Sequence, residues 1–283
     1  MANFFERLLS KKPPRMPAPM RDVAALIEPL RLPAVHLTLS PDRSRSHFGG
    51  VPNLPPELAW PQRKGRRLGF LARLSLADLQ QVQAIDWLPT TGALLFFYDL
   101  DEQPWGYDPK DRGGAVVMHV TDLDEPPAVQ DRDDEGTAVA IPHRWFSFRN
   151  AWTSPPADRD AIGALQLTDE ELDALSDVEQ AEFQGLPKHQ VGGYPSPVQG
   201  SDMDLECQLV THGLYCGNSS GYEDSRAAEL SRGAKDWRLL LQFDSDDDLS
   251  VMWGDVGMIY FWIQDEAARR GDFSNAWLIL QCC

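Results

Sequence analysis

Hydrophobic and polar positions are most clearly ordered between residues 237 and 264, where the pattern predicts two strands joined by an acidic connection. In the second strand, residues 258–263, the side chains on both faces are apolar. One face carries Met258, Tyr260 and Trp262, and the other carries Ile259, Phe261 and Ile263. A strand that is apolar on both sides is typical of the middle of a sheet that is covered on both faces.

The preceding strand, residues 237–244, differs because it carries polar side chains among apolar ones. Gln242 and Asp244 share one face with Leu240. An unpaired polar group buried in a sheet costs about 1–3 kcal/mol, so these two side chains need partners. The partners are either loops of the protein itself or a bound ligand, and the sequence leaves both open.

The same arrangement occurs earlier in the chain, which indicates an internal duplication. Residues 70–75 (FLARLS) align with 239–244 (LLLQFD), and 92–99 (GALLFFYD) align with 257–264 (GMIYFWIQ). A Gly-Gly-x-Pro segment with a histidine shortly before it precedes each strand pair, at 47–52 and at 189–195. We therefore expect an α+β fold with mixed, mainly antiparallel sheets and flanking helices. Its two pseudo-repeated halves, about 32–120 and 165–283, should pack as one body.

The chain is expected to consist of a short tail, residues 1–20, and a single domain, residues 21–283. In the tail, residues 2–9 are expected to form a short amphipathic helix, and a proline-rich connector, residues 13–19, follows it. Two helices are predicted to begin after Ser75 and Thr168, because Asp78 and Glu171 follow them at the spacing of a capping box.

The charge of the chain is strongly negative, with 26 basic and 43 acidic residues and a net charge of −17 at pH 7. Such a field opposes binding to nucleic acid and to anionic membranes, and it favours a basic protein partner. The chain shows no secretory or membrane-spanning segment, and its four cysteines lack the density of a disulfide scaffold. We therefore expect a cytoplasmic protein with reduced thiols.

Acidic and amide side chains are concentrated in the second half of the proposed repeat. The alignment sets Gln242 opposite Arg73, Asp244 opposite Ser75 and Asp255 opposite Thr90. If one half carries a ligand site, the second half is the better candidate. The candidate ligand-binding residues are His189, Gly192, Gly193, Gln199, Gln242, Asp244, Trp253 and Asp255. The alternative is that these groups tie loops to strands, as buried polar groups usually do.

Metal and cofactor sites are not expected. Asp244, Asp246 and Asp248 have the spacing of a calcium loop, but Leu249 occupies the sixth position, where that loop requires glycine. A second acidic alternation, residues 202–206, would place three carboxylates on one face of a strand. No G-x-S-x-G, H-E-x-x-H or P-loop pattern is present, so no catalytic residue can be named.

Four ordered blocks carry a resemblance to a known family. They are HFGGVPNLP…WP…GFLARLSLADL, PWGYDP, HQVGGYPSPVQ and LLLQFDSDDDLSVMWGDVGMIYFWI, and together they span roughly residues 35–280. In this combination the chain resembles the YwqG-like family of bacterial proteins, whose domain has no known function. The resemblance implies a mixed α+β fold with antiparallel sheets and a cytoplasmic location. The family often has Gln where this chain has Arg73, so a ligand role of the first-half position is in doubt.

Two functional classes follow from these observations. The first is a binding or interaction protein whose acidic surface suits a basic partner, such as the toxin-neutralising immunity proteins proposed among relatives of this family. The second is an enzyme that uses Asp244, Asp255 and His189 for acid–base or metal-assisted chemistry. The missing nucleophile patterns favour the binding class. The oligomeric state stays open.

Overall fold

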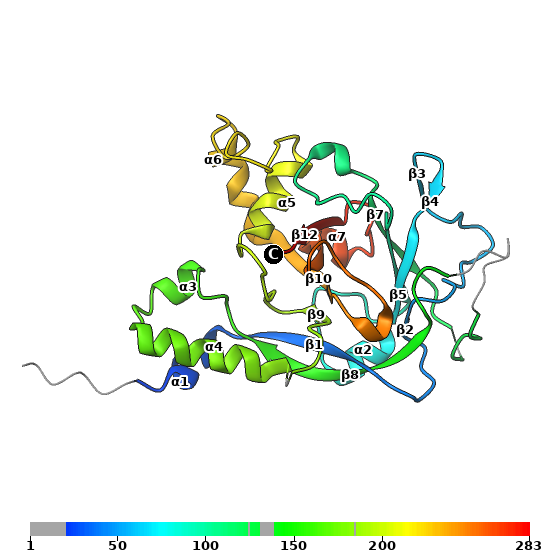
Figure 1. Cartoon of the computed structure of the whole chain (residues 1–283), viewed down its shortest axis with the longest axis horizontal. Helices are drawn as coiled ribbons and strands as arrows, with labels where there is room; N and C mark the ends of the chain where they lie inside the picture. Colours follow the sequence, from blue (N-terminus) through cyan, green and yellow to red (C-terminus); the bar gives the residue numbers. More distant parts are fainter. Residues whose placement is uncertain (1–20, 124, 131–138, 184) are drawn as a thin grey trace, which may run out of the picture.

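A computed structural model of the chain describes residues 21–123, 125–130, 139–183 and 185–283 (Figure 1). The expected tail, residues 1–20, lies outside the described residues. Strands from both ends of the described chain join one ten-stranded sheet, in which every pairing is antiparallel. An α+β fold with a mainly antiparallel sheet is therefore confirmed.

The sheet curls until its two edge strands, β7 and β12, lie beside each other, so that it is nearly closed into a barrel (Figure 1). From one edge to the other the strands are β12 (Trp277–Gln281), β11 (Met258–Gln264), β10 (Trp237–Asp244), β9 (Gln190–Gly192), β1 (Leu32–Leu39), β8 (Arg144–Thr153), β2 (His47–Phe48), β5 (Gly69–Ser75), β6 (Ala93–Tyr98) and β7 (Ala115–Val120). A separate small hairpin consists of β3 (Gln62–Arg63) and β4 (Arg66–Arg67).

Short helices flank this sheet. They are α1 (Val23–Ile27), α2 (Leu76–Val82), α3 (Asp160–Gly163), α4 (Asp169–Phe183), α5 (Met203–Thr211), α6 (Ala227–Leu230) and α7 (Asp265–Arg269). The described residues also form the 3-10 turns η1 (Glu28–Leu30), η2 (Pro109–Asp111), η3 (Ser231–Asp236) and η4 (Asp247–Leu249). Among the described residues, no helix combines the length and the apolar character needed to span a bilayer.

Both predicted helix starts are present and are capped as expected. The hydroxyl of Ser75 accepts a hydrogen bond from the backbone N–H of Asp78 at the start of α2. Thr168 and Glu171 exchange two hydrogen bonds across the first turn of α4, from backbone to side chain in both directions. These bonds satisfy N–H groups that have no partner within the helix, which is why the local sequence sets both helix starts.

The main core fills the interior of the curled sheet and joins both halves of the chain. β6 and β11 are buried on both faces apart from Gln264, as their apolar patterns predict. Inside the barrel, Phe96 of β6 and Phe261 of β11 meet edge to face, with ring centroids 5.2 Å apart. The outer face of β10, β11 and β12 packs against α5 and α6 in a second hydrophobic cluster that includes Cys207, Trp237 and Trp277.

Candidate functional site

Gln242 has hydrogen-bond partners within the protein for both atoms of its side-chain amide. Its Oε1 accepts from the backbone N–H of Ser196 at 2.8 Å, and its Nε2 donates to the carbonyl of Lys188 at 2.7 Å. The side chain is fully buried. The structure therefore shows the loop-tying alternative at this position, with a polar side chain on a strand holding a crossing loop.

His189 and Asp246 form a buried pair beside Gln242. The His189 ring lies between Phe48 and Phe243, with both centroids 4.9 Å away. Its Nδ1 accepts from the backbone N–H of Asp244 at 3.1 Å, so Nε2 carries the hydrogen that is donated to Asp246 Oδ2 at 3.0 Å. Burial acts to raise the pKa of Asp246, but the hydrogen bonds from His189 and from backbone N–H groups hold it below its ordinary value.

Asp244 and Trp253 belong to the same network. The Asp244 carboxylate accepts from the backbone N–H of Lys188 at 2.8 Å, and its carbonyl accepts from the indole N–H of Trp253 at 3.1 Å. Gly192 and Gly193 lie beside this network, both with positive φ. A Cβ on Gly193 would lie 2.3 Å from the hydroxyl of Thr153, so the close approach requires glycine.

The two other predicted site residues lie apart from this network. Asp255 is an exposed residue of the loop before β11, where its carbonyl accepts from the backbone N–H of Cys283. Gln199 is exposed and donates to the carbonyl of Cys282 at 2.9 Å. The structure thus brings His189, Gln242, Asp244 and Trp253 together with the two glycines, but it leaves Gln199 and Asp255 outside.

A row of polar side chains on three neighbouring strands explains where Gln199 lies. Gln242 of β10, Tyr260 of β11 and Gln281 of β12 all hold the segment 194–200 through its backbone. Gln281 alone accepts from two consecutive N–H groups, those of Val198 and Gln199, at 3.0 Å each. This row holds the segment 194–200 across the outer face of the sheet and places Gln199 at the edge of a cleft.

That cleft, called here the acidic cleft, has a volume of about 640 Å³. It lies between the segment 102–111, α5, the loop 215–217 and the end of β12. Its lining residues are Glu102, Gln103, Pro104, Trp105, Tyr107, Asp108, Asp111, Gln199, Gly200, Glu206, Tyr215, Cys216, Gly217 and Gln281. Among these described residues there are four carboxylates and three large aromatic rings, and none is Lys or Arg.

Three consecutive carbonyls of residues 105–107 hold this wall of the cleft, two of them on β12 and one on the loop 215–217. Trp105 accepts from Leu280 at 2.9 Å, Gly106 from the indole of Trp277 at 2.8 Å, and Tyr107 from Cys216 at 2.8 Å. Gly106 has a φ of +85°, and a Cβ there would lie 1.8 Å from the Leu278 carbonyl. Only glycine permits this approach, which holds the aromatic side chains on either side at the cleft wall.

Glu206 is the carboxylate of the cleft that is least satisfied by the protein. One oxygen accepts from the hydroxyl of Tyr222 at 3.2 Å, and the other is buried without a hydrogen-bond partner among the described residues. Burial is the main cause that raises the pKa of Glu206 to about 7. The expected strand over residues 202–206 is wrong, because these residues begin α5, and helical geometry turns Glu206 into the cleft while Asp204 pairs with Arg159 at 2.6 Å.

The other carboxylates of the cleft have partners. Glu102 is held by Lys64 at 2.8 Å on the adjoining hairpin, and Asp111 accepts from the backbone N–H of Gly106 at 2.9 Å. Asp108 caps the turn η2 through the N–H of Lys110. Glu206 is therefore the group most able to receive a hydrogen-bond donor from a ligand.

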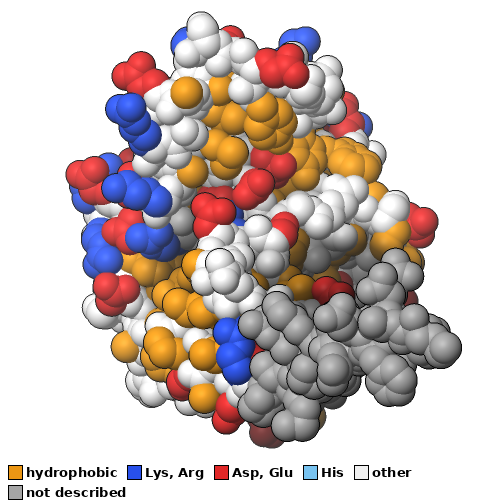
Figure 2. All heavy atoms as spheres, turned by 90° about the vertical axis from the view of Figure 1, so that its left-hand side faces the viewer, with side chains coloured by type: hydrophobic (Ala, Val, Ile, Leu, Met, Phe, Trp, Pro, Cys, Tyr) orange, Lys and Arg blue, Asp and Glu red, His pale blue; other side chains and the backbone are white. Residues whose placement is uncertain are grey.

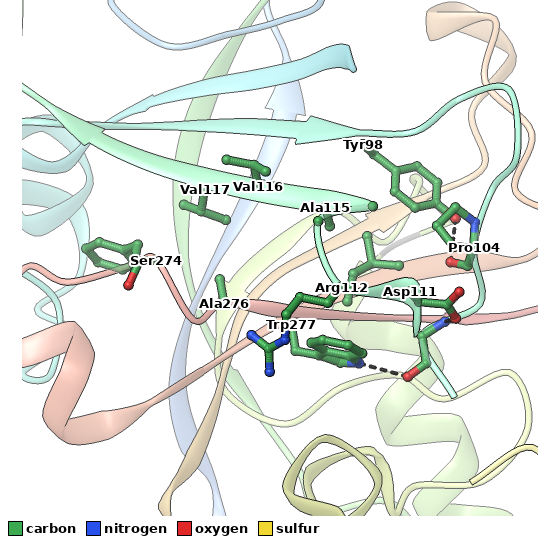
Figure 3. Close-up of a pocket in the computed structure, with 15 residues that line it drawn as sticks. Tyr98, Pro104, Asp111, Arg112, Ala115, Val116, Val117, Ser274, Ala276 and Trp277 are labelled. Carbon is green, nitrogen blue, oxygen red and sulfur yellow. Dashed lines mark hydrogen bonds between the residues drawn. The ribbon is translucent and has the colours of Figure 1, made fainter. Parts of the chain in front are cut away.

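A smaller pocket, called here the seam pocket, lies between the edge strands β7 and β12 and has a volume of about 200 Å³ (Figure 3). The segment 104–111 borders both this pocket and the acidic cleft, and Pro104 and Asp111 line both. Its walls include residues 115–117 of β7 and, before and within β12, Phe273, Ser274, Ala276, Trp277 and Leu278. Figure 3 shows Arg112 beside the ring of Trp277 at its margin.

Sequence reasoning missed Glu206, Trp105 and Tyr107 as site residues. A signal for the two aromatic residues was present, since PWGYDP was one of the four blocks that carried the resemblance. Glu206 stood out locally only as part of the acidic alternation 202–206, and its surroundings in the cleft come from segments about 10 to 100 residues away in the sequence.

In the described part of the chain, no group of three or more His, Cys, Asp or Glu side chains is arranged to hold a metal ion.

Comparison with known proteins shows the family of the chain. No curated protein matches the chain. A family model described as a domain of unknown function matches residues 46–282, a range that includes the acidic cleft, the seam pocket and the loop-tying network. The chain therefore belongs to the DUF1963 family.

Proposed function

We propose that the protein binds a basic protein partner and that the acidic cleft receives a cationic side chain of that partner. The observation that carries this proposal is the buried Glu206 oxygen, which has no hydrogen-bond partner among the residues that the structure describes and lies in a cleft lined by carboxylates and aromatic rings. An ammonium or guanidinium group would supply the missing donor and would keep the carboxylate ionised.

The aromatic rings and the overall charge support a cationic ligand. Trp105 and Tyr215 are large side chains that stay partly exposed, at 46% and 43%. A cation over such a ring gains about 0.5–2 kcal/mol, depending on how far it is desolvated. The net charge of −17 would also steer a basic partner towards the protein. Figure 2 shows acidic side chains scattered over the face that carries α3, α4 and α6, with Lys and Arg gathered mainly along one margin.

The proposal includes an immunity-type role in the cytoplasm, within the YwqG-like group. A protein that neutralises a basic toxin needs an acidic surface with a preformed anchor for one cationic side chain, and the cleft has the chemistry of such an anchor. Four free cysteines, three of them buried, suit a reducing compartment.

The geometry gives less support to an enzyme built on His189 and the aspartates. His189 is 2% exposed, and both of its ring nitrogens are hydrogen-bonded within the protein. Asp255 lies outside this network on an exposed loop. A substrate would have no access to the buried pair without a large rearrangement, so the binding class is preferred.

We also infer that residues 21–283 form a single domain that arose by duplication. From the central pair β1 and β8, each half of the sheet continues outward through a short strand, a strand with a register shift, a fully apolar strand and an edge strand. The register shifts fall at equivalent positions, and both Gly-Gly pairs have positive φ. The register shift lies between Phe70 and Ala72 in β5 and between Leu239 and Leu241 in β10. The glycine pairs are residues 49–50 and 192–193.

Side-chain contacts support the same inference. Ser46 accepts a hydrogen bond from the backbone N–H of Ser75 at 2.9 Å, and His189 accepts one from the N–H of Asp244 at 3.1 Å. Ser75 and Asp244 are opposite each other in the sequence alignment. Arg73, which the sequence alignment sets opposite Gln242, is also buried on its strand. It forms an ion pair with the carboxylate of Asp122 at 2.8 Å.

Binding of heptalysine, measured by calorimetry at low and high salt, tests the proposed function. Glu206→Gln should weaken binding by about tenfold at low salt, because a buried carboxylate and its ligand would lose their charge interaction. The matched control is Glu170→Gln on α4, which changes the net charge equally but lies exposed outside the cleft. Equal effects of the two variants would show binding to general surface charge and would refute a role of the cleft.

A further inference from the structure

The seam pocket is built from the two strand edges that do not pair with each other. In the described chain β7 and β12 lie side by side without a hydrogen-bonded ladder between them. The segment 104–107 closes one end of the gap through the bond from Leu280 to the Trp105 carbonyl. His119 and Phe273 contact each other at the other end, with centroids 5.7 Å apart. The space left between these two closures is the pocket of about 200 Å³.

The walls of this pocket are mainly small or apolar side chains. Ala115, Val116 and Val117 form one side, and Phe273, Ala276 and Leu278 contribute to the other. An apolar cavity of about 150 Å³ is large enough to hold benzene. The seam pocket therefore has room for a ring or a short aliphatic chain, which would bury apolar surface there.

Arg112, which has no ion-pair partner in the described part of the chain, lies at the margin of the pocket. The Arg112 guanidinium carbon lies 5.4 Å from the centroid of the Trp277 ring, and Arg112 is exposed. No carboxylate of the described residues lies within ion-pair distance of it. The nearest acidic lining residue, Asp111, accepts from the backbone N–H of Gly106 and is 3.9 Å from Arg63. Asp272 accepts from Ser274 at 2.6 Å.

We propose that the seam pocket binds a small apolar molecule or chain end that bears a carboxylate. The apolar part lies between β7 and β12, and the carboxylate pairs with Arg112 at the pocket margin (Figure 3). The planar guanidinium presents a fork of donors that matches a carboxylate, and stacking on Trp277 keeps the fork oriented. This site differs from the acidic cleft in its charge preference, and Pro104 and Asp111 are the two lining residues that both share.

Two sources can supply this chemistry, a free carboxylic acid and the C-terminal residue of a peptide. Calorimetric titration of the full chain with hexanoate and benzoate, each compared with its amide, tests the first source. A peptide that ends in leucine, compared as free acid and as C-terminal amide, tests the second. We expect the acid to bind at least about tenfold more tightly than the amide in one or both arms, because the amide lacks the charge that Arg112 pairs.

Arg112→Gln should abolish the preference for the acid. Arg67→Gln is the matched control, because Arg67 is an exposed arginine that lies 5.0 Å over another indole, that of Trp60. It should keep the wild-type preference. Ala276→Leu, which fills the pocket and keeps Arg112, should weaken both the acid and the amide. The proposal is overturned by absent binding in both arms, by equal affinity for acid and amide, or by equal effects of the two arginine variants.

Discussion

Replacing Glu206 by Gln should stabilise the protein above pH 7 and change its stability little near pH 4.5. Burial is the main cause that raises the pKa of Glu206 from its ordinary value of 4.5 to about 7, and the hydrogen bond from Tyr222 only partly opposes it. A carboxyl with a raised pKa holds its proton more tightly in the folded protein than in the unfolded chain. Stability therefore falls as the pH rises from about 4.5 to about 7, and glutamine removes this loss.

The size of the effect follows from the same pKa. One pKa unit corresponds to about 1.4 kcal/mol, so a rise from 4.5 to about 7 corresponds to at most ~3.5 kcal/mol. Because Glu206 is partly accessible to water, we expect a difference of about 1–3 kcal/mol at pH 8. Glutamine has nearly the same shape and keeps an oxygen that can accept from Tyr222, so packing should change little.

Urea unfolding of the wild type and Glu206→Gln between pH 4.5 and pH 8.5 measures this difference. The matched control is Glu102→Gln, an exposed carboxylate of the same cleft whose pKa is lowered mainly by a hydrogen bond from Lys64. The ionised Glu102 carboxylate stabilises the folded protein above its ordinary pKa, and this stabilisation is lost at lower pH. The Glu102→Gln variant should therefore be less stable than the wild type at neutral pH. A stability difference for Glu206→Gln that does not change with pH, or that decreases as pH rises, would refute the reasoning.

Three further changes test the loop-tying network by urea or acid unfolding. Gln242→Ala should lower the free energy of unfolding by about 2–4 kcal/mol because it leaves two part-buried backbone groups unpaired, whereas Gln199→Ala should cost less than about 1 kcal/mol. Gly193→Ala should cost more than about 2 kcal/mol, because steric overlap adds to its positive φ, whereas Gly185→Ala, with a similar φ and open space, should cost about 1 kcal/mol. Asp246→Asn should be destabilising at pH 7, with the difference shrinking as the pH falls through the lowered pKa of that carboxyl. The assigned contacts would be contradicted if Gln242→Ala and Gln199→Ala, or Gly193→Ala and Gly185→Ala, changed the free energy of unfolding equally. An effect of Asp246→Asn that does not depend on pH would also contradict them.

The outcome at Gln242 shows how far sequence reasoning reaches for a buried polar side chain. Its position on an apolar strand required hydrogen-bond partners, and the structure supplies two. The sequence could not tell whether these partners were a ligand or a loop. They are backbone groups of Lys188 and Ser196, more than 40 residues away, so only the folded chain decides between the alternatives.

Glu206 shows the opposite case. Its alternation with Asp202 and Asp204 predicted a strand, but the segment forms α5 because Met203, Cys207 and Val210 supply a buried stripe at helical spacing. The alternation of the three acidic residues has the period of a strand, whereas the buried residues of this segment have the period of a helix. The raised pKa of Glu206 then depends on burial against loops from other parts of the chain, which no local pattern contains.

The sequence by itself determined the features that depend on neighbours along the chain. These are the two-faced apolar strands, the capped helix starts and the glycines where the backbone turns, because side-chain periodicity and capping act over a few residues. Tertiary structure alone decided that the sheet curls until β7 and β12 meet, and that the acidic cleft and the seam pocket both form along residues 104–111. The acidic cleft and the seam pocket are lined by segments that lie far apart in the sequence. Burial of the common core brings these segments together, and no periodic sequence pattern extends over such distances.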